Sequence, residues 1–302
     1  MSITRKTSAE ENLIGDEEKN AIIKGMLYLV ATPIGNLSDL SHRAIKVLRE
    51  VDFIAAEDTR ITQKLLAFIG VKKELISYFE HNKRERGEII AARLAAGESC
   101  ALVTDAGTPA ISDPGEDLVA LCAERNIPIT SIPGPCAAIL GLTLSALPVG
   151  RFVFEGFLST AKNERKKRLN ELASEKRTFV LYEAPHKLRA TLSDLHITLG
   201  NRKIAICREL TKLNEEVIRT DLEGAITLYK ERDPRGEYVL VVAGNPDAGA
   251  DNCFWENLPA AEHVSYYIDT LGMSKMDAIK AAAKDRGLAK SILYRQLNID
   301  KN

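Results

Sequence analysis

The chain has 302 residues, 45% hydrophobic and 27% charged, which is enough for a globular protein with a sizeable core. Its formal net charge is −1, which excludes a general polycation, so any nucleic-acid binding depends on local basic patches. The five cysteines form no Cys-x-x-Cys pair and no apolar run is long enough to span a bilayer. We therefore expect a cytoplasmic protein without a membrane segment.

Short apolar strands alternate with helices from Met26 onward. Residues 1–24 before them are polar and mixed in charge, and we expect a disordered leader. The strand patterns are "MLYLVATP", "DFIAAED", "ELISYF", "CALVTDAG" and "IPITSIPG". Helical patterns separate them at 38–50, 59–69, 83–96 and 115–125, with Ser38 as an N-cap and Gly70 as a stop signal. This alternation predicts an N-terminal α/β domain at 25–148, with a mostly parallel sheet covered on both faces.

A second α/β block follows a helical stretch at 136–146. Its strands are expected in "FVFEGFL", "TFVLYEA", "KIAICREL", "EEVIRTDL" and "EYVLVVAG". Helices are expected at 163–175, 186–198 and 223–231. The strands near 204–210 and 215–221 follow each other without a helix between them, which predicts an antiparallel hairpin in a mixed sheet. We therefore expect a C-terminal α/β domain at 149–246.

The rest of the chain, at 255–302, follows the linker pattern "NPDAGADN" and is helical in pattern. Two short helices are predicted on either side of Gly287. Their apolar faces comprise Met276, Ile279 and Ala283 on the first helix, and Leu288, Ile292, Leu293 and Leu297 on the second. Six basic and two acidic residues lie between Gly272 and Asn298. The pattern resembles a helix-turn-helix that binds RNA or docks on the ribosome, and the alternative is a helical pair that covers a core or a dimer interface.

Common catalytic and nucleotide-binding motifs are missing. The sequence has no G-x-x-x-x-G-K-[ST] loop, no G-x-G-x-x-G after the first strand, and neither H-E-x-x-H nor G-x-S-x-G. The five histidines show no metal-ligand spacing. A Walker-type nucleotide site, a metal site and a serine hydrolase are therefore disfavoured, and we expect no metal.

Four loops with little side-chain bulk follow strands of the first sheet: "ATPIGN", "AAEDTR", "TDAGTPAISDPG" and "IPGP". Ligands of open α/β sheets bind at the carboxyl ends of the strands, and glycine lets the backbone approach a ligand closely. The carboxylates of Glu57, Asp58, Asp105 and Asp113 favour positive charge there. Any one of these loops is explained by a tight turn with a solvated acid. Four at one edge of one sheet predict a site for a neutral or cationic ligand.

Several segments, which together cover about residues 26 to 245, resemble a known family in their sequence, order and spacing. They are "LYLVATPIGNLSDLSHRAIKVLREVDFIAAEDTR", "LVTDAGTPAISDPG", "SIPGPCAAILGLTLSALP", "FEGFL", "VLYEAPHKL", "CRELTKLNEEVIR" and "GEYVLVVAG". The chain resembles the tetrapyrrole methylase-like superfamily and, within it, the bacterial 16S rRNA cytidine 2′-O-methyltransferases. It departs from the wider superfamily in "TPIGN" and in "GTPAISDPG", where Thr108 stands in an aspartate position. Both departures are typical of the RNA-modifying branch.

The resemblance implies two α/β domains with mixed sheets plus a small C-terminal helical extension. It also implies S-adenosylmethionine as the methyl donor, a cytidine ribose in the decoding region of 16S rRNA as the acceptor, and a homodimer. The substrate is either naked rRNA or the assembled small ribosomal subunit. Residues carried over as donor contacts are Pro33, Ile34, Asp105, Gly107, Thr108, Pro109, Ile111, Ser131, Pro133, Gly134, Tyr182, Leu210 and Gly244.

A ribose hydroxyl is a weak nucleophile, so a general base would assist methyl transfer. We expect Asp58 in this role, with Glu183, Glu57 and His186 as alternatives, and Arg60 to hold a phosphate or orient a carboxylate. Each of these residues also has a structural interpretation. The acids before the helix at 59–69, for example, complement its dipole.

Two basic segments are candidate RNA contacts. They are Lys162, Arg165, Lys166, Lys167 and Arg168 in "KNERKKR", and Lys284, Arg286 and Lys290 near the C-terminus. The alternative is that they form solvated helix faces. Two other functions fit the sequence less well: methylation of a small tetrapyrrole, and ribosome binding without catalysis.

Overall fold

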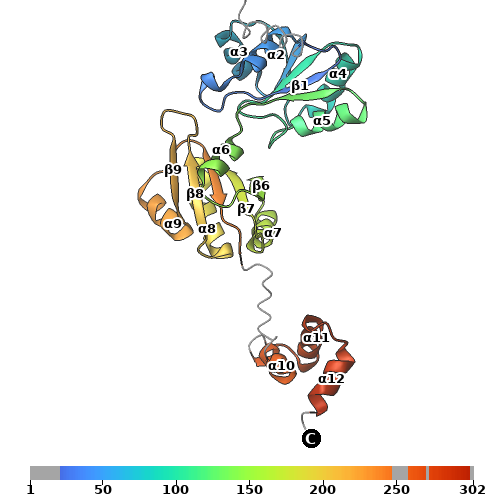
Figure 1. The fold of residues 1–302 in the computed structure, drawn as a ribbon, viewed down its shortest axis with the longest axis vertical. Coiled ribbons are helices and arrows are strands. Elements are labelled where there is room, and N and C mark those ends of the chain that lie inside the picture. The colour runs from blue at the N-terminus through green and yellow to red at the C-terminus, as the bar shows by residue number, and fades with distance from the viewer. Residues whose placement is uncertain (1–20, 247–257, 270–271, 300–302) are drawn as a thin grey trace, which may run out of the picture. The chain divides into compact units, whose positions relative to one another are not determined.

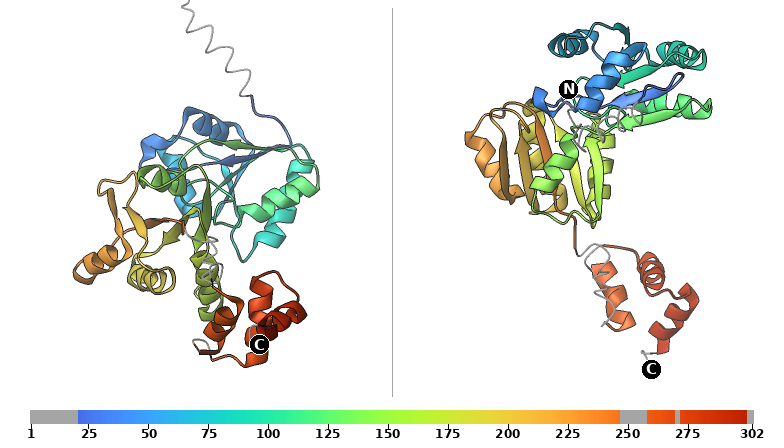
Figure 2. Two further views of the ribbon diagram at one scale, coloured as in Figure 1. Left: turned by 60° about the horizontal axis from the view of Figure 1, so that its bottom comes forward. Right: turned by 45° about the horizontal axis from the view of Figure 1, so that its top comes forward.

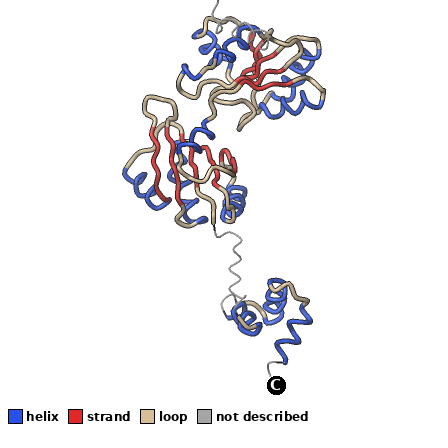
Figure 3. Tube along the Cα trace, viewed as in Figure 1, coloured by secondary structure: helices blue, strands red, loops and turns tan. Residues whose placement is uncertain are grey.

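The structure is a computed structural model that describes residues 21–246, 258–269 and 272–299. The chain divides into two compact units, one of Met1–Leu172 with Arg177–Gly244 and one of Ala173–Lys176 with Asn245–Asn302. The first unit contains two five-stranded sheets, and helices make up the described part of the second (Figures 1 and 3). No helix in these ranges is both long and apolar enough to cross a membrane.

The first sheet has the strand order β3-β2-β4-β1-β5, with all neighbours parallel. Its strands are β1 (Leu27–Val30), β2 (Phe53–Ala56), β3 (Glu74–Ser77), β4 (Cys100–Val103) and β5 (Ile129–Ile132). Every residue of β2 and β4 is buried, as in a sheet covered on both sides. The prediction of a mostly parallel sheet is confirmed.

Helices cover both faces of this sheet (Figure 2). They are η1 (Leu37–Asp39), α2 (His42–Glu50), α3 (Thr59–Phe68), α4 (Lys83–Ala95) and α5 (Gly115–Glu124). The helices α2 and α3 pack on one face, and α4 and α5 on the other. Alternate residues of each strand enter these two cores, as the period of a β-strand requires.

The start of α2 differs from the prediction, and the end of α3 agrees with it. Ser41, not Ser38, caps α2, with its hydroxyl accepting a bond from the Ala44 amide. The predicted start was wrong because Asn36 caps the short helix η1 first and accepts from the Ser38 amide. Gly70 follows α3 with a φ of 66°, which confirms it as the stop.

The predicted leader overlaps the fold. Its residues 1–20 lie outside the described residues. Ile22, however, packs against the first core, and the Ile23 amide donates to the Tyr28 hydroxyl. The first domain therefore begins a few residues earlier than the expected boundary.

The second sheet has the order β6-β7-β10-β8-β9 and is mixed. Its strands are β6 (Phe152–Phe157), β7 (Thr178–Glu183), β8 (Lys203–Arg208), β9 (Glu216–Asp221) and β10 (Tyr238–Val242). The strands β6 and β7 are parallel, whereas β10 is antiparallel to both β7 and β8. The antiparallel pairing of β8 with β9 confirms the predicted hairpin.

The two faces of the second sheet are covered by different parts of the chain. One face packs against α7 (Lys162–Ala173), α8 (Pro185–Leu199) and α9 (Leu222–Glu231). The other is covered by α6 (Ala137–Leu144), which the sequence placed in the N-terminal domain. A Cβ on Gly141 would lie 2.7 Å from a Val239 methyl group, so α6 sits closer to the sheet than a side chain allows. The helix α6 thus joins the two α/β halves.

The second unit contains α10 (Ala260–Asp269), α11 (Lys275–Asp285) and α12 (Lys290–Ile299). Gly287 links α11 to α12 with a φ of 63°, as predicted. Ile279, Ala283 and Leu293 form the centre of its core. Met276 and Ile292, predicted to lie on the apolar faces, are exposed instead, because α10 supplies Val264 to the same core.

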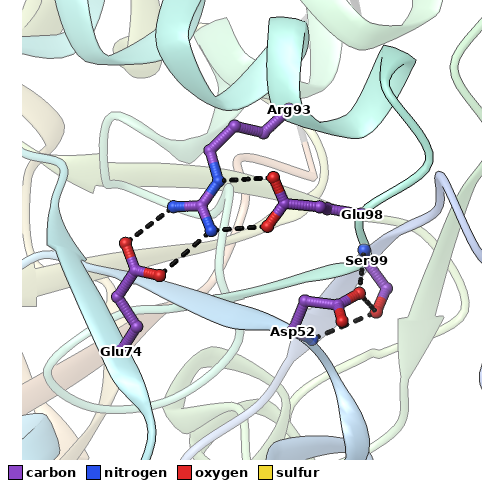
Figure 4. Close-up of polar contacts among 5 residues, drawn as sticks. All are labelled: Asp52, Glu74, Arg93, Glu98 and Ser99. Atoms are coloured by element: carbon purple, nitrogen blue, oxygen red, sulfur yellow. Dashed lines mark hydrogen bonds and ion pairs between the residues drawn. The ribbon is translucent and has the colours of Figure 1, made fainter.

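Figure 4 shows an ionic cluster at the amino-terminal edge of the first sheet. The Arg93 guanidinium donates two hydrogen bonds to Glu74 and two to Glu98, at 2.6 to 3.0 Å. It also lies 3.8 Å above the Phe53 ring. Beside it, the Ser99 amide and hydroxyl both donate to Asp52 at 2.7 Å. The cluster ties β3, α4 and β4 together, far from the carboxyl ends of the strands.

We expect Arg93→Met to lower the free energy of unfolding by about 1–2 kcal/mol near neutral pH, since the pairs are partly exposed. Arg93 holds the pKa of Glu74 below its usual 4.5, so this contribution is present above that value and is lost as the pH falls through the lowered pKa. The stability difference from wild type should therefore shrink at about pH 3. Urea unfolding at both pH values measures it, and a difference that is independent of pH would contradict the prediction.

Candidate functional site

The loops at the carboxyl edge of the first sheet contact one another, as the sequence predicted. Thr32 and Gly107 form an isolated antiparallel bridge, with hydrogen bonds of 2.9 and 3.1 Å between their backbones. The Thr108 hydroxyl donates to the Pro135 carbonyl at 2.9 Å. These bonds join the loops after β1, β4 and β5. Gly107 has a φ of 91°, which a side chain would strain.

The loop after β2 joins the same network through carboxylates. Glu57 accepts a hydrogen bond from the Thr104 hydroxyl at 2.6 Å. Asp105 accepts one from the Asp58 amide at 3.0 Å. Burial and the nearby Glu57 raise the pKa of Asp105. All four loops therefore form one continuous rim.

Asp113 organises the glycine- and proline-rich loop from within. Its carboxylate accepts hydrogen bonds from the amides of Ala110, Ile111 and Gly115, at 2.8 to 3.1 Å. Ala110 and Ser112 have φ values of 67° and 64°, an unusual conformation for residues other than glycine. A Cβ on Gly115 would lie 2.6 Å from the carboxylate. The loop is thus a rigid, carboxylate-centred turn.

Residues of the second sheet face this rim. Tyr182 lies at the end of β7, and its hydroxyl accepts a hydrogen bond from the Ala138 amide at the start of α6. Burial raises the pKa of Tyr182 to about 12, which keeps it neutral. Its ring packs edge-on against Phe154 and Phe157, with centroids 5.2 and 5.6 Å apart.

A cavity of about 530 Å³ lies between the rim and the second sheet, a size typical of small-molecule sites. Its lining combines exposed backbone, apolar side chains and carboxylates. The lining residues from the first half are Ile34, Glu57, Thr104, Ala106, Gly107, Thr108, Ile111, Ser112, Asp113, Cys136 and Ala137. Those from the second half are Phe157, Tyr182, Glu183, Ala184, Pro185, His186, Cys207, Leu210, Glu237, Tyr238 and Val239.

Six of the residues expected to contact a donor line this cavity: Ile34, Gly107, Thr108, Ile111, Tyr182 and Leu210. Another five lie in the same loops without lining it, namely Pro33, Asp105, Pro109, Pro133 and Gly134, and Ser131 lies within β5 and does not line it either. Gly134 closely approaches Ala31, the residue that follows β1, since a Cβ on Gly134 would lie 2.7 Å from the Ala31 side chain.

Gly244 is placed away from the cavity. Because β10 runs antiparallel to β7 and β8, its first residues, Tyr238 and Val239, lie beside the ends of those strands. Gly244 follows the other end of β10. The sequence motif alone did not reveal this strand direction.

The three expected catalytic residues differ in their surroundings. Asp58 caps α3 and accepts from the Arg60 backbone and guanidinium, which lowers the pKa of Asp58 to about 2. Neither Asp58 nor Arg60 lines the cavity, and the Arg60 side chain is 86% exposed. Glu183 is buried in the cavity wall and accepts from the Ala184 amide and the Thr191 hydroxyl. Of the three, Glu183 alone lines the cavity.

The expected RNA contacts also divide into two groups. Arg165 pairs with Asp194 on α8, and Arg168 pairs with Glu155 on β6 and with Glu171 three residues further along α7 itself. Arg286 bonds the His263 ring and the Leu258 carbonyl within the second unit. These three arginines have structural partners. The exposed lysines Lys162, Lys166, Lys167, Lys284 and Lys290 form no ion pair with any described residue.

Several cavity residues had no role assigned from the sequence, among them Phe157, Cys207 and Glu237. Phe157 belongs to the quoted segment "FEGFL", and Gly156 before it has a φ of 63°. A glycine followed by an aromatic residue at a strand end was the signal that could have identified this wall.

Comparison with known proteins agrees with this architecture. The family described as Tetrapyrrole (Corrin/Porphyrin) Methylases matches residues 26–226. A protein of Halalkalibacterium halodurans, named ribosomal RNA small subunit methyltransferase I, is 47% identical over 90% of this chain and 94% of its own length. A Bacillus subtilis protein of the same name is 44% identical over 91% and 94%.

Among solved structures, a uroporphyrin-III-C-methyltransferase from Thermus thermophilus is similar in fold, with a TM-score of 0.52. It is 21% identical, and the match covers 78% of this chain and all of that one. At this identity the likeness concerns the fold alone. The match of the family and the identity to the two relatives establish the conclusion: the chain belongs to the tetrapyrrole methylase family, in the group of proteins named ribosomal RNA small subunit methyltransferase I.

Proposed function

We propose that this protein is an S-adenosylmethionine-dependent methyltransferase that acts on the RNA of the small ribosomal subunit. The finer proposal is that it methylates the ribose 2′-hydroxyl of a cytidine in the decoding region of 16S rRNA. The observation that carries the proposal is the cavity, in which bare backbone at Ala106–Gly107 and the carboxylates of Glu57 and Asp113 surround one space. The name shared by the relatives supports ribosomal RNA as the substrate class.

The cavity residues fit a cationic methyl donor. S-adenosylmethionine supplies, when bound, a methyl group on a positively charged sulfonium. Gly107 leaves peptide groups accessible, while Ile34, Ile111 and Leu210 provide apolar walls. The carboxylates of Glu57 and Asp113 attract positive charge. Holding the donor and the acceptor in line, with water excluded, is the main catalytic contribution of such a site.

The proton of the ribose hydroxyl requires an acceptor in the cavity. Glu57 uses its Oε2 atom for the Thr104 hydroxyl, and its Oε1 atom accepts no bond from any described residue. Glu183 uses both oxygens within the wall. A carboxylate that Arg60 holds at a pKa of about 2, such as Asp58, is a weak base. The geometry therefore favours Glu57, then Glu183, over Asp58.

RNA binding is assigned to three exposed lysines of α7, Lys162, Lys166 and Lys167, and to two of the exposed lysines of the second unit, Lys284 and Lys290. Neutralising phosphates with such side chains supplies most of the affinity for RNA. The proposal includes a homodimer in the cytoplasm as the working form. Either naked 16S rRNA or the assembled small subunit is the substrate.

Transfer of a tritiated methyl group to RNA from cells that lack the gene tests the proposal. Label should appear in 16S rRNA, and mapping of 2′-O-methyl groups should place it at one cytidine. Supplying naked rRNA and small subunits in parallel identifies the substrate. Absence of label in both, together with tight donor binding by calorimetry, would favour a small-molecule acceptor such as a tetrapyrrole. Absence of both label and donor binding would indicate a ribosome-binding protein without catalysis.

A further inference from the structure

Phe157 is an exposed aromatic side chain on the cavity wall. It ends β6, and 59% of its surface is accessible although it lines the cavity. Its ring is held in place by an edge-on contact with Tyr182, which packs in turn against Phe154. An exposed phenylalanine gains free energy when another apolar surface covers it. A fixed, accessible ring on a cavity wall therefore indicates a ligand surface.

Gly156, the residue before Phe157, lies directly beside the loop organised by Asp113. The register between β6 and β7 shifts between Phe154 and Gly156, and Gly156 takes a φ of 63°. A Cβ on Gly156 would lie 2.8 Å from the Ser112 hydroxyl oxygen. The end of β6 thus touches the loop that the proposed function assigns to the donor. A group resting on Phe157 is next to that loop.

Positive charge follows Phe157 along the chain. The helix α7 begins at Lys162, five residues later, and Lys166 and Lys167 lie one turn further along the helix. All three lysines are exposed and form no ion pair with a described residue. Sites for single-stranded nucleic acid combine an aromatic face for a base with cations for the backbone. A small apolar ligand would need the ring but not the lysines.

We propose that Phe157 is the platform on which the base of the acceptor nucleotide stacks, unpaired and turned out of the RNA helix. Enzymes that act on a nucleotide in structured nucleic acid commonly take it out of the stack in this way. The assignment rests on the proposed function, since it names how that acceptor is held. Stacking the base on Phe157 sets its ribose near the Ser112 loop and its phosphates toward α7.

Phe157→Leu and Phe157→Trp in the full chain test this role. Stacking of a base on an aromatic ring contributes substantially to binding affinity, and leucine offers no stacking face. Phe157→Leu should therefore raise KM and Kd for the substrate RNA about tenfold. The affinity for S-adenosylhomocysteine, measured by calorimetry, should stay unchanged. Phe157→Trp, which keeps a stacking face, should restore RNA binding. Phe68→Leu is the matched control, because Phe68 is 61% exposed on α3 and does not line the cavity.

Three results would overturn the assignment. RNA affinity unchanged in Phe157→Leu would show that no base rests on the ring. A loss of S-adenosylhomocysteine binding with unchanged RNA binding would place the ring in the donor pocket. A change of oligomeric mass in Phe157→Leu, measured by light scattering, would show that a second copy of the chain covers it. If wild-type protein transfers no methyl group to RNA, the proposed function itself fails, and that result is separate from the variants.

Discussion

Asp113→Ala is expected to weaken donor binding about a hundredfold while the protein stays folded. The substitution removes the acceptor of three backbone amides, and a hydrogen bond to a charged group is worth about 1.5–3 kcal/mol. If the loop is no longer held in its binding conformation, the free energy of donor binding should weaken by about 3 kcal/mol, which corresponds to about a hundredfold weaker binding. Ala110 and Ser112 then relax from their left-handed conformations, and Ile111 between them leaves the cavity wall. Calorimetry with S-adenosylhomocysteine measures the effect.

Two further variants make this prediction specific. Asp113→Asn keeps one acceptor oxygen but replaces the other, which accepts from Ile111, with a donor, so its loss should be intermediate. Asp117→Ala is the control, because Asp117 lies on α5, pairs with Lys83 and does not line the cavity. Equal losses in Asp113→Ala and Asp117→Ala would mean that general destabilisation is responsible, and would refute a positioning role.

The sequence predicted the first half of the site well, and the reason is physical. In a parallel sheet the direction of every strand is known once the alternation of strand and helix is recognised. The loops after β1, β2, β4 and β5 must then share one edge, which the Thr32–Gly107 bridge and the hydrogen bonds of Asp105 and Thr108 confirm. Glycine and proline also indicate special backbone conformations from the sequence alone, because their conformational properties do not depend on tertiary contacts.

The second half depended on partners that are distant in the chain. Gly244 was misplaced because the direction of β10 follows from its pairing with β7 and β8, which no local pattern reveals. Arg165 and Arg168 belong to a basic run but pair with Asp194 and Glu155 on other elements. Charge along the sequence therefore overestimates the charge available to a ligand. Structure was needed to separate the free lysines from the paired arginines.

A second large effect is expected on RNA affinity, because the lysines of α7, unlike its arginines, are available to contact phosphates. Replacing Lys162, Lys166 and Lys167 with alanine should weaken RNA binding roughly 50-fold at about 0.15 M salt. Each contact with a single-stranded phosphate contributes about 0.7 to the salt slope, which at that salt concentration is about fourfold in affinity. The slope of log K against log salt should fall by about 2. Filter binding over a salt series measures both quantities.

The matched control replaces Lys24, Lys72 and Lys73, which lie before β1 and β3 at the opposite edge of the first sheet. It removes the same charge, so a purely non-specific attraction would weaken equally in both triple variants. If binding instead depends on the lysines of α7, the control should keep the wild-type slope, and donor affinity should be unchanged in both. A wild-type slope in the α7 variant would indicate that the second unit binds the RNA instead, and the exposed Lys284 and Lys290 would be the next lysines to replace. The salt slope is the decisive quantity, because it counts the phosphates that these side chains contact.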